Sequence, residues 1–279
     1  MAVATDEWLR LIEAEYLRGF IPGGGAGVKF AVTATDAEAH VVQRAIRQIA
    51  GEQRLLAVAL DSAVVRLHMI QDVFFSIARQ VDWETTAQAF MEGLFAKNGY
   101  VWPRPGEAVP IAELGDANAV DITILQRDIR QWLTRQVMRE PGMAQEFRIA
   151  MTRLCLHRLS PDDDSGALVP PVLEWLRGDL RAIGTLRAAQ IYTKVTRHNA
   201  RAMLRSLCRW LRMVGHAGLA LTLDARRLPL LLPAGTEGVR YAPAALLDAY
   251  EVLRQLIDEA DHFEGTTCSA IFLGDHTLV

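Results

Sequence analysis

Cysteine and long apolar runs are both scarce in this chain. The three cysteines, Cys155, Cys208 and Cys268, are odd in number and far apart among 279 residues, which argues against a disulfide framework and favours a reducing compartment. No apolar run approaches the roughly 18 residues of a membrane span, and the N-terminal segment lacks the basic start and continuous apolar stretch of a signal peptide. We therefore expect a cytoplasmic protein with no membrane partner.

Common catalytic and metal-binding signatures are missing as well. The sequence contains no GxSxG motif and no HExxH, and its histidines and cysteines show no metal-ligand spacing, so we predict no metal site. The net charge is only −3, so any affinity for nucleic acid requires a local basic patch. With 51% hydrophobic and 23% charged residues, the chain has the composition of a globular protein with a sizeable core.

What is present in the first part of the chain is an alternation of short apolar runs with amphipathic segments. The predicted elements are helix 5–18, strand 28–32, helix 36–51, strand 55–60 and helix 67–80. We expect Asp36 to cap the second helix, and the second strand ends on Asp61. This alternation predicts a parallel sheet covered by helices, with binding sites at the carboxyl ends of its strands.

The middle of the chain is mostly helical, and the strand pattern returns near the end. The predicted helices are 83–98, 118–139, 143–158, 170–183 and 197–214. Strand 218–224, helix 243–260 and strand 269–273 follow. We interpret the chain as one composite domain: residues 1–82 and 197–279 form the two halves of an α/β core, and 83–196 are a large helical insertion.

The turn after the first predicted strand is where a phosphate-binding loop would lie. Such a loop needs glycines, a lysine and a Ser/Thr for magnesium, but residues 33–40 read TATDAEAH. Thr33 and Thr35 are present, whereas Asp36 and Glu38 bring negative charge to the helix start. The glycines of PGGGAG and Lys29 precede the strand, so a structural turn is the better interpretation of that segment.

The strand 218–224, GLALTLD, resembles a Walker B segment. In that motif the aspartate at the end of a buried strand orients magnesium, and a following glutamate polarises water. Asp224 is present, but the next residue is Ala225, so the carboxylate that activates water is absent. An apolar run that ends in aspartate is also common in any parallel sheet.

A basic ridge on a core helix is the strongest positive feature of the sequence. At about 100° per residue, Lys194, Arg201, Arg205 and Arg212 fall within a narrow arc, with His198 and Arg209 beside it, and together they form the predicted ridge. A separate apolar face consists of Leu204, Leu207, Leu211 and Val214. The ridge suits nucleic-acid phosphates, an acidic partner or a neighbour's nucleotide. The alternative is a solvated face paired with acidic segments such as 162–164 or 257–261.

Three blocks of the chain resemble the P-loop domain of the BREX-type ATP-binding proteins, which are associated with bacterial defence against phage. These blocks are EWLRLIEAEYLRGFIPGGGAGVKFAV, QIYTKVTRHNARAMLRSLCRWLRMVGHAGLALTLD and YEVLRQLIDEADHFEGTTCSAIFLGD. The resemblance implies a three-layer, AAA-like P-loop NTPase fold. It also implies a glycine-rich loop, an Asp-Glu pair and a polar sensor after the last strand, whereas this chain has Thr33 to His40, Asp224 with Ala225, and residues 274–277 at those places.

From the resemblance and the missing residues together we expect a catalytically inactive P-loop NTPase-like subunit. It would act as a scaffold or regulator in an anti-phage defence complex, with a protein partner such as an active ATPase of the same system and no cofactor of its own. One alternative is an ATPase that binds ATP and Mg²⁺ through Lys29 and Asp224. Another is a nucleic-acid-binding module that uses the basic ridge on DNA.

Overall fold

The computed structural model describes residues 3–160, 167–230, 237–258 and 268–274 of the chain, which divides into two compact units. Residues 1–80 and 216–279 form the first, here called the sheet unit, and residues 81–215 form the second, here called the helical unit. Within the described residues, no helix is long and apolar enough to cross a membrane.

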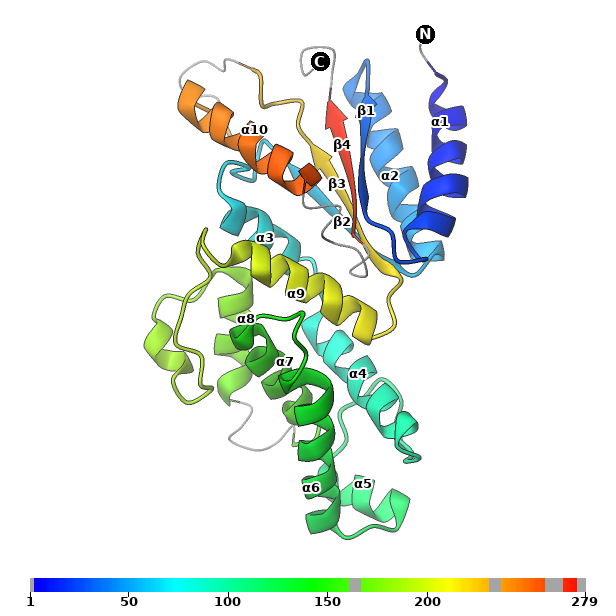
Figure 1. Cartoon of the computed structure of the whole chain (residues 1–279), viewed down its shortest axis with the longest axis vertical. Coiled ribbons are helices and arrows are strands. Elements are labelled where there is room, and N and C mark those ends of the chain that lie inside the picture. Colours follow the sequence, from blue (N-terminus) through cyan, green and yellow to red (C-terminus); the bar gives the residue numbers. More distant parts are fainter. Residues whose placement is uncertain (1–2, 161–166, 231–236, 259–267, 275–279) are drawn as a thin grey trace. The chain divides into compact units, whose positions relative to one another are not determined.

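The sheet unit is built on four parallel strands. They are β1 (Gly27–Val32), β2 (Leu55–Asp61), β3 (Gly218–Asp224) and β4 (Cys268–Gly274), in the order β1-β4-β3-β2 (Figure 1). Val32 is in register with Gly274, and Asp61 with Asp224. The carboxyl ends of all four strands therefore meet at one edge, and the predicted parallel α/β sheet is confirmed.

Helices pack on both faces of this sheet because the strand side chains are apolar on both sides. One face carries α1 (Thr5–Leu11), its π-helical continuation η1 (Ile12–Phe20), and α2 (Asp36–Glu52). The buried side of α2 packs with Ala220 of β3 and Ile271 of β4 in a single apolar cluster. The other face carries α3 (Ile70–Ala78) and α10 (Pro243–Asp258) (Figure 1).

The helical unit contains the predicted helical middle of the chain. Its elements are α4 (Trp83–Lys97), α5 (Ile111–Asn118), α6 (Ile122–Leu133) with its π-helical end η2 (Thr134–Met138), α7 (Gln145–His157), α8 (Val169–Arg177), the 3₁₀ turn η4 (Ile183–Leu186) and α9 (Ala200–Met213). Aromatic pairs such as Trp83 with Phe147 and Phe90 with Trp210 fill its core.

Three of the predicted helices in this unit need correction. The predicted helix 170–183 ends at Arg177 as α8, because Gly178 adopts a left-handed φ of 80°. Residues 118–139 do not form one helix, because Ala119 adopts a left-handed φ of 52° that ends α5, and the Asp121 side chain then caps α6 by accepting from the Thr123 and Ile124 N–H groups. Helix α5 was missed altogether. Helix α9 begins at Ala200 and not at 197, so Lys194 lies before the helix.

Helix α9 groups with the helical unit and not with the sheet, although the predicted division at residue 196 assigns it to the α/β core. Its Trp210 indole N–H donates to Thr86 Oγ1 at 3.2 Å, and Ser206 Oγ accepts the Ala144 N–H at 2.8 Å. The predicted apolar face is present: Leu204, Leu207 and Leu211 are buried.

Candidate functional site

A cavity of about 1260 Å³ opens at the carboxyl edge of the parallel sheet, within the sheet unit. Its walls come from the turn after β1, the start of α2, the ends of β2 and β3, and the segments that follow β3. The lining residues are Thr33, Ala34, Thr35, Asp36, His40, Gln43, Ala59, Leu60, Asp61, Ala63, Val64, Asp224, Arg226, Arg227, Leu230, Glu237, Gly238 and Val239. Thr33, Thr35, Asp36 and Asp224 of the predicted site are thus brought together around one space.

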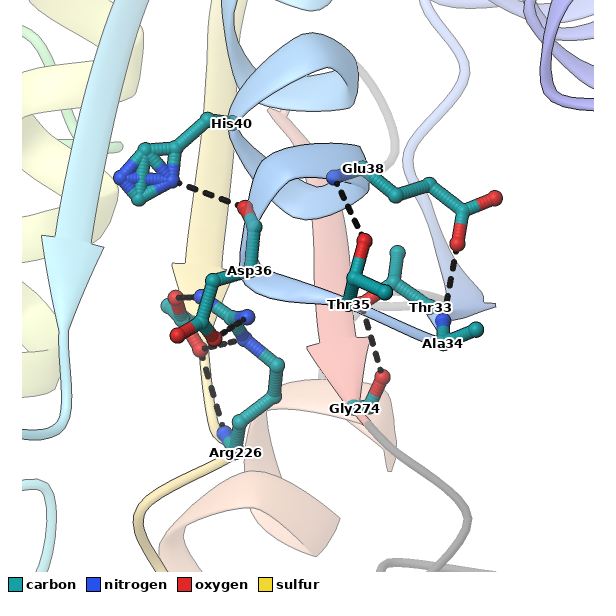
Figure 2. A network of polar contacts seen from close by, with 9 residues as sticks. Thr33, Ala34, Thr35, Asp36, Glu38, His40, Arg226 and Gly274 are labelled. Carbon is teal, nitrogen blue, oxygen red and sulfur yellow. Dashed lines mark hydrogen bonds and ion pairs between the residues drawn. The ribbon is translucent and has the colours of Figure 1, made fainter.

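The turn between β1 and α2 is short and closed. Only residues 33–35 separate Val32 from the first residue of α2. Thr33 is buried, and its N–H donates to the Gly274 carbonyl at 2.9 Å, which continues the pairing of β1 with β4 (Figure 2). Because the backbone N–H of Thr33 points into the sheet, it is not available to an anion.

The amino end of α2 is capped by its own side chains. Thr35 is the capping residue, and its Oγ1 accepts the Glu38 N–H at 3.2 Å, so the expectation that Asp36 caps this helix is wrong (Figure 2). The Glu38 carboxylate turns back to accept the Ala34 N–H at 2.8 Å and the Thr5 hydroxyl at 2.6 Å. This reciprocal arrangement satisfies helix-start N–H groups that would otherwise attract a phosphate.

The Glu38 carboxylate is stabilised in its charged form by these contacts. The hydrogen bond from Thr5 and then that from the Ala34 N–H hold the pKa of Glu38 below its ordinary value. A negative charge is therefore fixed beside the turn at neutral pH. It occupies the favourable field of the helix start that a bound anion would otherwise use.

Arg226 joins the two aspartates of the cavity, and the sequence analysis missed it. Its Nε donates to Asp224 Oδ1 at 2.9 Å and its Nη2 to Asp224 Oδ2 at 2.5 Å, a two-pronged contact, while Nη1 reaches Asp36 Oδ1. Figure 2 shows the Asp36 and Arg226 side chains pointing toward one another from α2 and from the end of β3. The hydrogen bonds to Asp224 raise the pKa of Arg226 further, so the guanidinium is a permanent charge.

Asp224 is consequently a partnered carboxylate. Its side chain is 10% exposed and that of Arg226 is 14% exposed, so water contributes little to the solvation of this pair. The Arg226 N–H also donates to Asp224 Oδ1, at 3.2 Å. In a Walker B site, a magnesium ion balances the charge of the aspartate. Here the guanidinium of Arg226 balances the charge of Asp224.

Ala225 directly follows β3, and Asp61 is the last residue of β2. Ala225 is fully buried and its N–H donates to the Leu273 carbonyl at 2.8 Å, so this position carries no carboxylate and lies against β4. Asp61, opposite Asp224 in the register, caps its own turn by accepting the Ala63 N–H at 2.7 Å. Ala225 therefore offers no general base for an attacking water.

The described lining of the cavity lacks the lysine clamp of a Mg·ATP site. A triphosphate needs a lysine or arginine free to clamp its terminal phosphates and a carboxylate free to hold magnesium. None of the described residues that line the cavity is a lysine, and Arg226 is committed to two aspartates. Arg227 is paired with no carboxylate in the described part of the chain; its Nη1 donates to the Glu237 carbonyl at 3.1 Å. Among the described residues, no group of three or more acidic, histidine or cysteine side chains could hold a metal ion.

Lys29 points elsewhere. Its ammonium lies 5.0 Å from the centroid of the Tyr16 ring, in a cation–π contact, and the residue does not line the cavity. The alternative in which Lys29 and Asp224 share a phosphate site therefore has Lys29 away from the cavity, and its Asp224 lines the cavity but is paired with Arg226. The expected sensor segment falls largely outside the described residues: Gly274 ends β4, and 275–277 are not described.

The predicted basic ridge is present only in part. Lys194 lies outside α9 and donates to the Arg181 carbonyl at 3.0 Å, so it is not part of a ridge on this helix. Arg209 is paired with Glu140 at 3.3 Å. Arg205 is exposed, whereas Arg201 and Arg212 are half-buried. The partner of Arg209 is neither of the two acidic segments expected; 162–164 and most of 257–261 lie outside the described residues.

Fold and cavity together define an α/β protein with a parallel four-stranded sheet and its candidate site at the carboxyl edge. A family model described as BREX system ATP-binding protein BrxC/D matches residues 112–278, more than half of the chain. The chain therefore belongs to this family and is a protein of a BREX defence system. Neither the curated proteins nor the solved structures gave a match.

Proposed function

We propose that this chain is a catalytically inactive P-loop NTPase-like subunit of a BREX system, acting as a scaffold or regulator beside other proteins of that system. The sheet is read as an AAA-like P-loop sheet whose nucleotide site has been replaced by internal contacts. The observation that carries the proposal is the bridge that Arg226 makes between Asp36 and Asp224.

The closed turn after β1 supports the same conclusion from the phosphate side. Three residues are too few to wrap a phosphate, and the Thr33 and Ala34 N–H groups donate to Gly274 and Glu38 instead. The chain has three lysines, Lys29, Lys97 and Lys194, and none of them lines the cavity. A triphosphate placed there would face the carboxylates of Asp36, Asp61 and Glu237, and of the two arginines among the described lining residues only Arg227 is not paired with a carboxylate.

Isothermal titration of the purified full chain with Mg·ATP tests the proposal directly. We expect no binding at millimolar nucleotide and no phosphate release above the buffer control. Micromolar affinity together with turnover contradicts the proposal. Micromolar affinity without turnover contradicts the loss of the nucleotide site but leaves the absence of hydrolysis standing.

Replacement of the internal cation tests the role of Arg226 separately. In Arg226→Ala the carboxylates of Asp36 and Asp224 lose their shared partner, and a magnesium ion that binds through one or two carboxylates can take its place. We expect millimolar Mg²⁺ to raise the Tm of Arg226→Ala and to leave the wild-type Tm unchanged. Arg227→Ala is the matched control, and equal Mg²⁺ shifts in all three proteins contradict this role.

A regulatory role predicts an effect on an active partner. The ATPase activity of the BREX-system ATPase with which the chain co-purifies is measured with and without added chain. We expect the rate or the nucleotide affinity of the partner to change at stoichiometric chain, and we expect the same change with Asp224→Asn/Arg226→Gln, because the pair is structural in this proposal. Loss of the effect in that double variant contradicts a purely structural role of the pair, because it means that the cavity residues take part in the regulation of the partner.

A further inference from the structure

The helical unit contains a stretch of the chain that is rich in basic residues and contributes none of the described lining residues of the cavity. Residues 180–215 contain eight of the 30 Lys and Arg residues of the chain and none of its 33 acidic residues. The net charge of −3 therefore conceals one strongly basic stretch in an otherwise acidic chain. Such local concentration of one sign of charge is the electrostatic footprint of a polyanionic partner.

Much of this charge is at the surface. The exposed basic side chains of the stretch are Arg181, Arg187, Lys194, Arg197 and Arg205. Among the described residues, Arg187, Arg197 and Arg205 form no ion pair with a carboxylate. Helix α9, which contributes Arg205, also has no acidic residue in its first turn, so the positive end of its dipole adds to the charge.

An exposed aromatic ring lies within the same stretch. Tyr192 is 66% exposed, and it follows Ile191, which is fully buried. The backbone on its carboxyl side is held in place, because the Trp175 indole N–H donates to the Thr193 carbonyl at 2.9 Å and the Asn199 amide donates to the Lys194 carbonyl at 3.1 Å. The ring is thus presented to solvent on a fixed backbone, two residues before Lys194 and five before Arg197 in the sequence.

We propose that Tyr192 and the exposed basic residues Arg187, Lys194, Arg197 and Arg205 form a binding surface for a single-stranded nucleic acid. Arginine guanidinium groups match phosphate oxygens in two-pronged contacts, and an exposed tyrosine stacks on an unpaired base. A duplex keeps its bases stacked inside, so it uses the charges but not the ring. Glu146 accepts the Thr193 hydroxyl at 2.9 Å beside this surface, and Glu140 pairs with Arg209, which is not part of it.

Fluorescence anisotropy with the full chain and a labelled single-stranded DNA of roughly 30 nucleotides tests the surface. With three to four phosphate contacts, we expect the Kd to rise roughly 20- to 50-fold between about 50 mM and about 200 mM salt. Saturable binding that a duplex of the same sequence competes only weakly supports the proposal. Absence of binding at the lower salt, or competition by polyglutamate as effective as that of the unlabelled strand, overturns it.

Paired variants separate this surface from general charge. Arg197→Gln/Arg205→Gln is expected to reduce the steepness of log Kd against log salt by about 1.4, as for two lost phosphate contacts on a single strand. Arg130→Gln/Arg135→Gln removes the same charge from two exposed arginines outside the basic stretch and is expected to change nothing. Equal effects of the two pairs overturn the assignment.

The tyrosine has its own pair of variants. Tyr192→Ala is expected to raise the Kd for the single strand roughly 5- to 100-fold, whereas Tyr192→Phe, which keeps the ring, retains wild-type affinity. A duplex bound as tightly as the strand, with Tyr192→Ala without effect, overturns the assignment to a single strand. Neither result bears on nucleotide binding at the sheet edge, since none of these residues lines that cavity.

Discussion

At the scale of single residues, Arg226 decides the chemistry of the sheet edge. A guanidinium that contacts both oxygens of one carboxylate and reaches a second carboxylate satisfies both negative charges without a metal ion. The pair with Asp224 is largely shielded from water, so its two members depend on one another. Removing one partner of a buried pair leaves an uncompensated charge, which costs far more than the pair contributes as a whole.

Arg226→Ala is therefore expected to lower the free energy of unfolding by about 2–4 kcal/mol, below the full buried value because both side chains retain some exposure. Asp224→Asn in the same chain is expected to restore most of this loss, since it removes the orphaned charge. Arg227→Ala, the neighbouring control, is expected to cost less than about 1 kcal/mol. Urea unfolding of the four proteins measures these differences. Additive losses in the double variant contradict the coupling.

Glu38 predicts a pH dependence that can be given a sign. Its folded-state pKa is lowered by the hydrogen bonds from Thr5 and the Ala34 N–H, so its stabilising contribution is present above the unfolded pKa of about 4.3 and is lost as the pH falls through the folded pKa. We expect Glu38→Gln to be less stable than wild type at neutral pH. The difference shrinks as the pH falls below about 4. A difference that is constant with pH, measured by urea unfolding, contradicts this account.

The missing phosphate loop and the missing second carboxylate could be predicted from the sequence, because the absence of a residue type at a position is visible in the sequence itself. No arrangement of residues 33–40 supplies the glycines or the lysine of a phosphate loop, and Ala225 cannot activate water. The Arg226 bridge could not be predicted, since it joins Asp36 and Asp224 across strands whose order is set by tertiary pairing. The only signal was the pair of arginines that follows Asp224 and Ala225.

At the scale of elements, the strands were predictable and several helix boundaries were not. Each strand is a short apolar run with a polar residue or a turn at its end, which identifies the strand but does not give its register. The α5–α6 junction contains no proline, and its glycine, Gly115, is buried inside α5. Helix α5 ends at Asn118 because Ala119 adopts a left-handed conformation, which is usually found at glycine or asparagine.

Ala119 gives a prediction in which one chemical change has opposite signs at two positions. Ala119→Gly relieves the left-handed conformation, with φ 52°, and is expected to stabilise by about 0.5–1 kcal/mol. Ala89→Gly, at an exposed position in the middle of α4, is expected to destabilise by about 1 kcal/mol. Thermal and urea unfolding compare both with wild type. Destabilisation by Ala119→Gly means that the junction is not held in this conformation.

At the scale of the whole molecule, packing and not sequence order decides where α9 belongs. The sequence places this helix directly before β3, and the four residues between α9 and β3 give no strong linker signal. In the structure its buried side chains contact α4 and the region before α7, through Trp210 with Phe90 and Ser206 with Ala144. Such contacts between residues more than 60 apart cannot be read from local patterns.

If packing sets this division, the helical unit should fold when expressed alone as residues 81–215. Five of the six tryptophans, Trp83, Trp102, Trp132, Trp175 and Trp210, are buried in it, so fluorescence reports directly on its core. We expect blue-shifted emission and one cooperative urea transition with a slope of about 1–2 kcal/mol/M. Phe147→Ala removes a fully buried ring beside Trp83 and should lower stability by about 3–5 kcal/mol. Red-shifted emission with strong ANS binding would mean that the core needs the rest of the chain to pack.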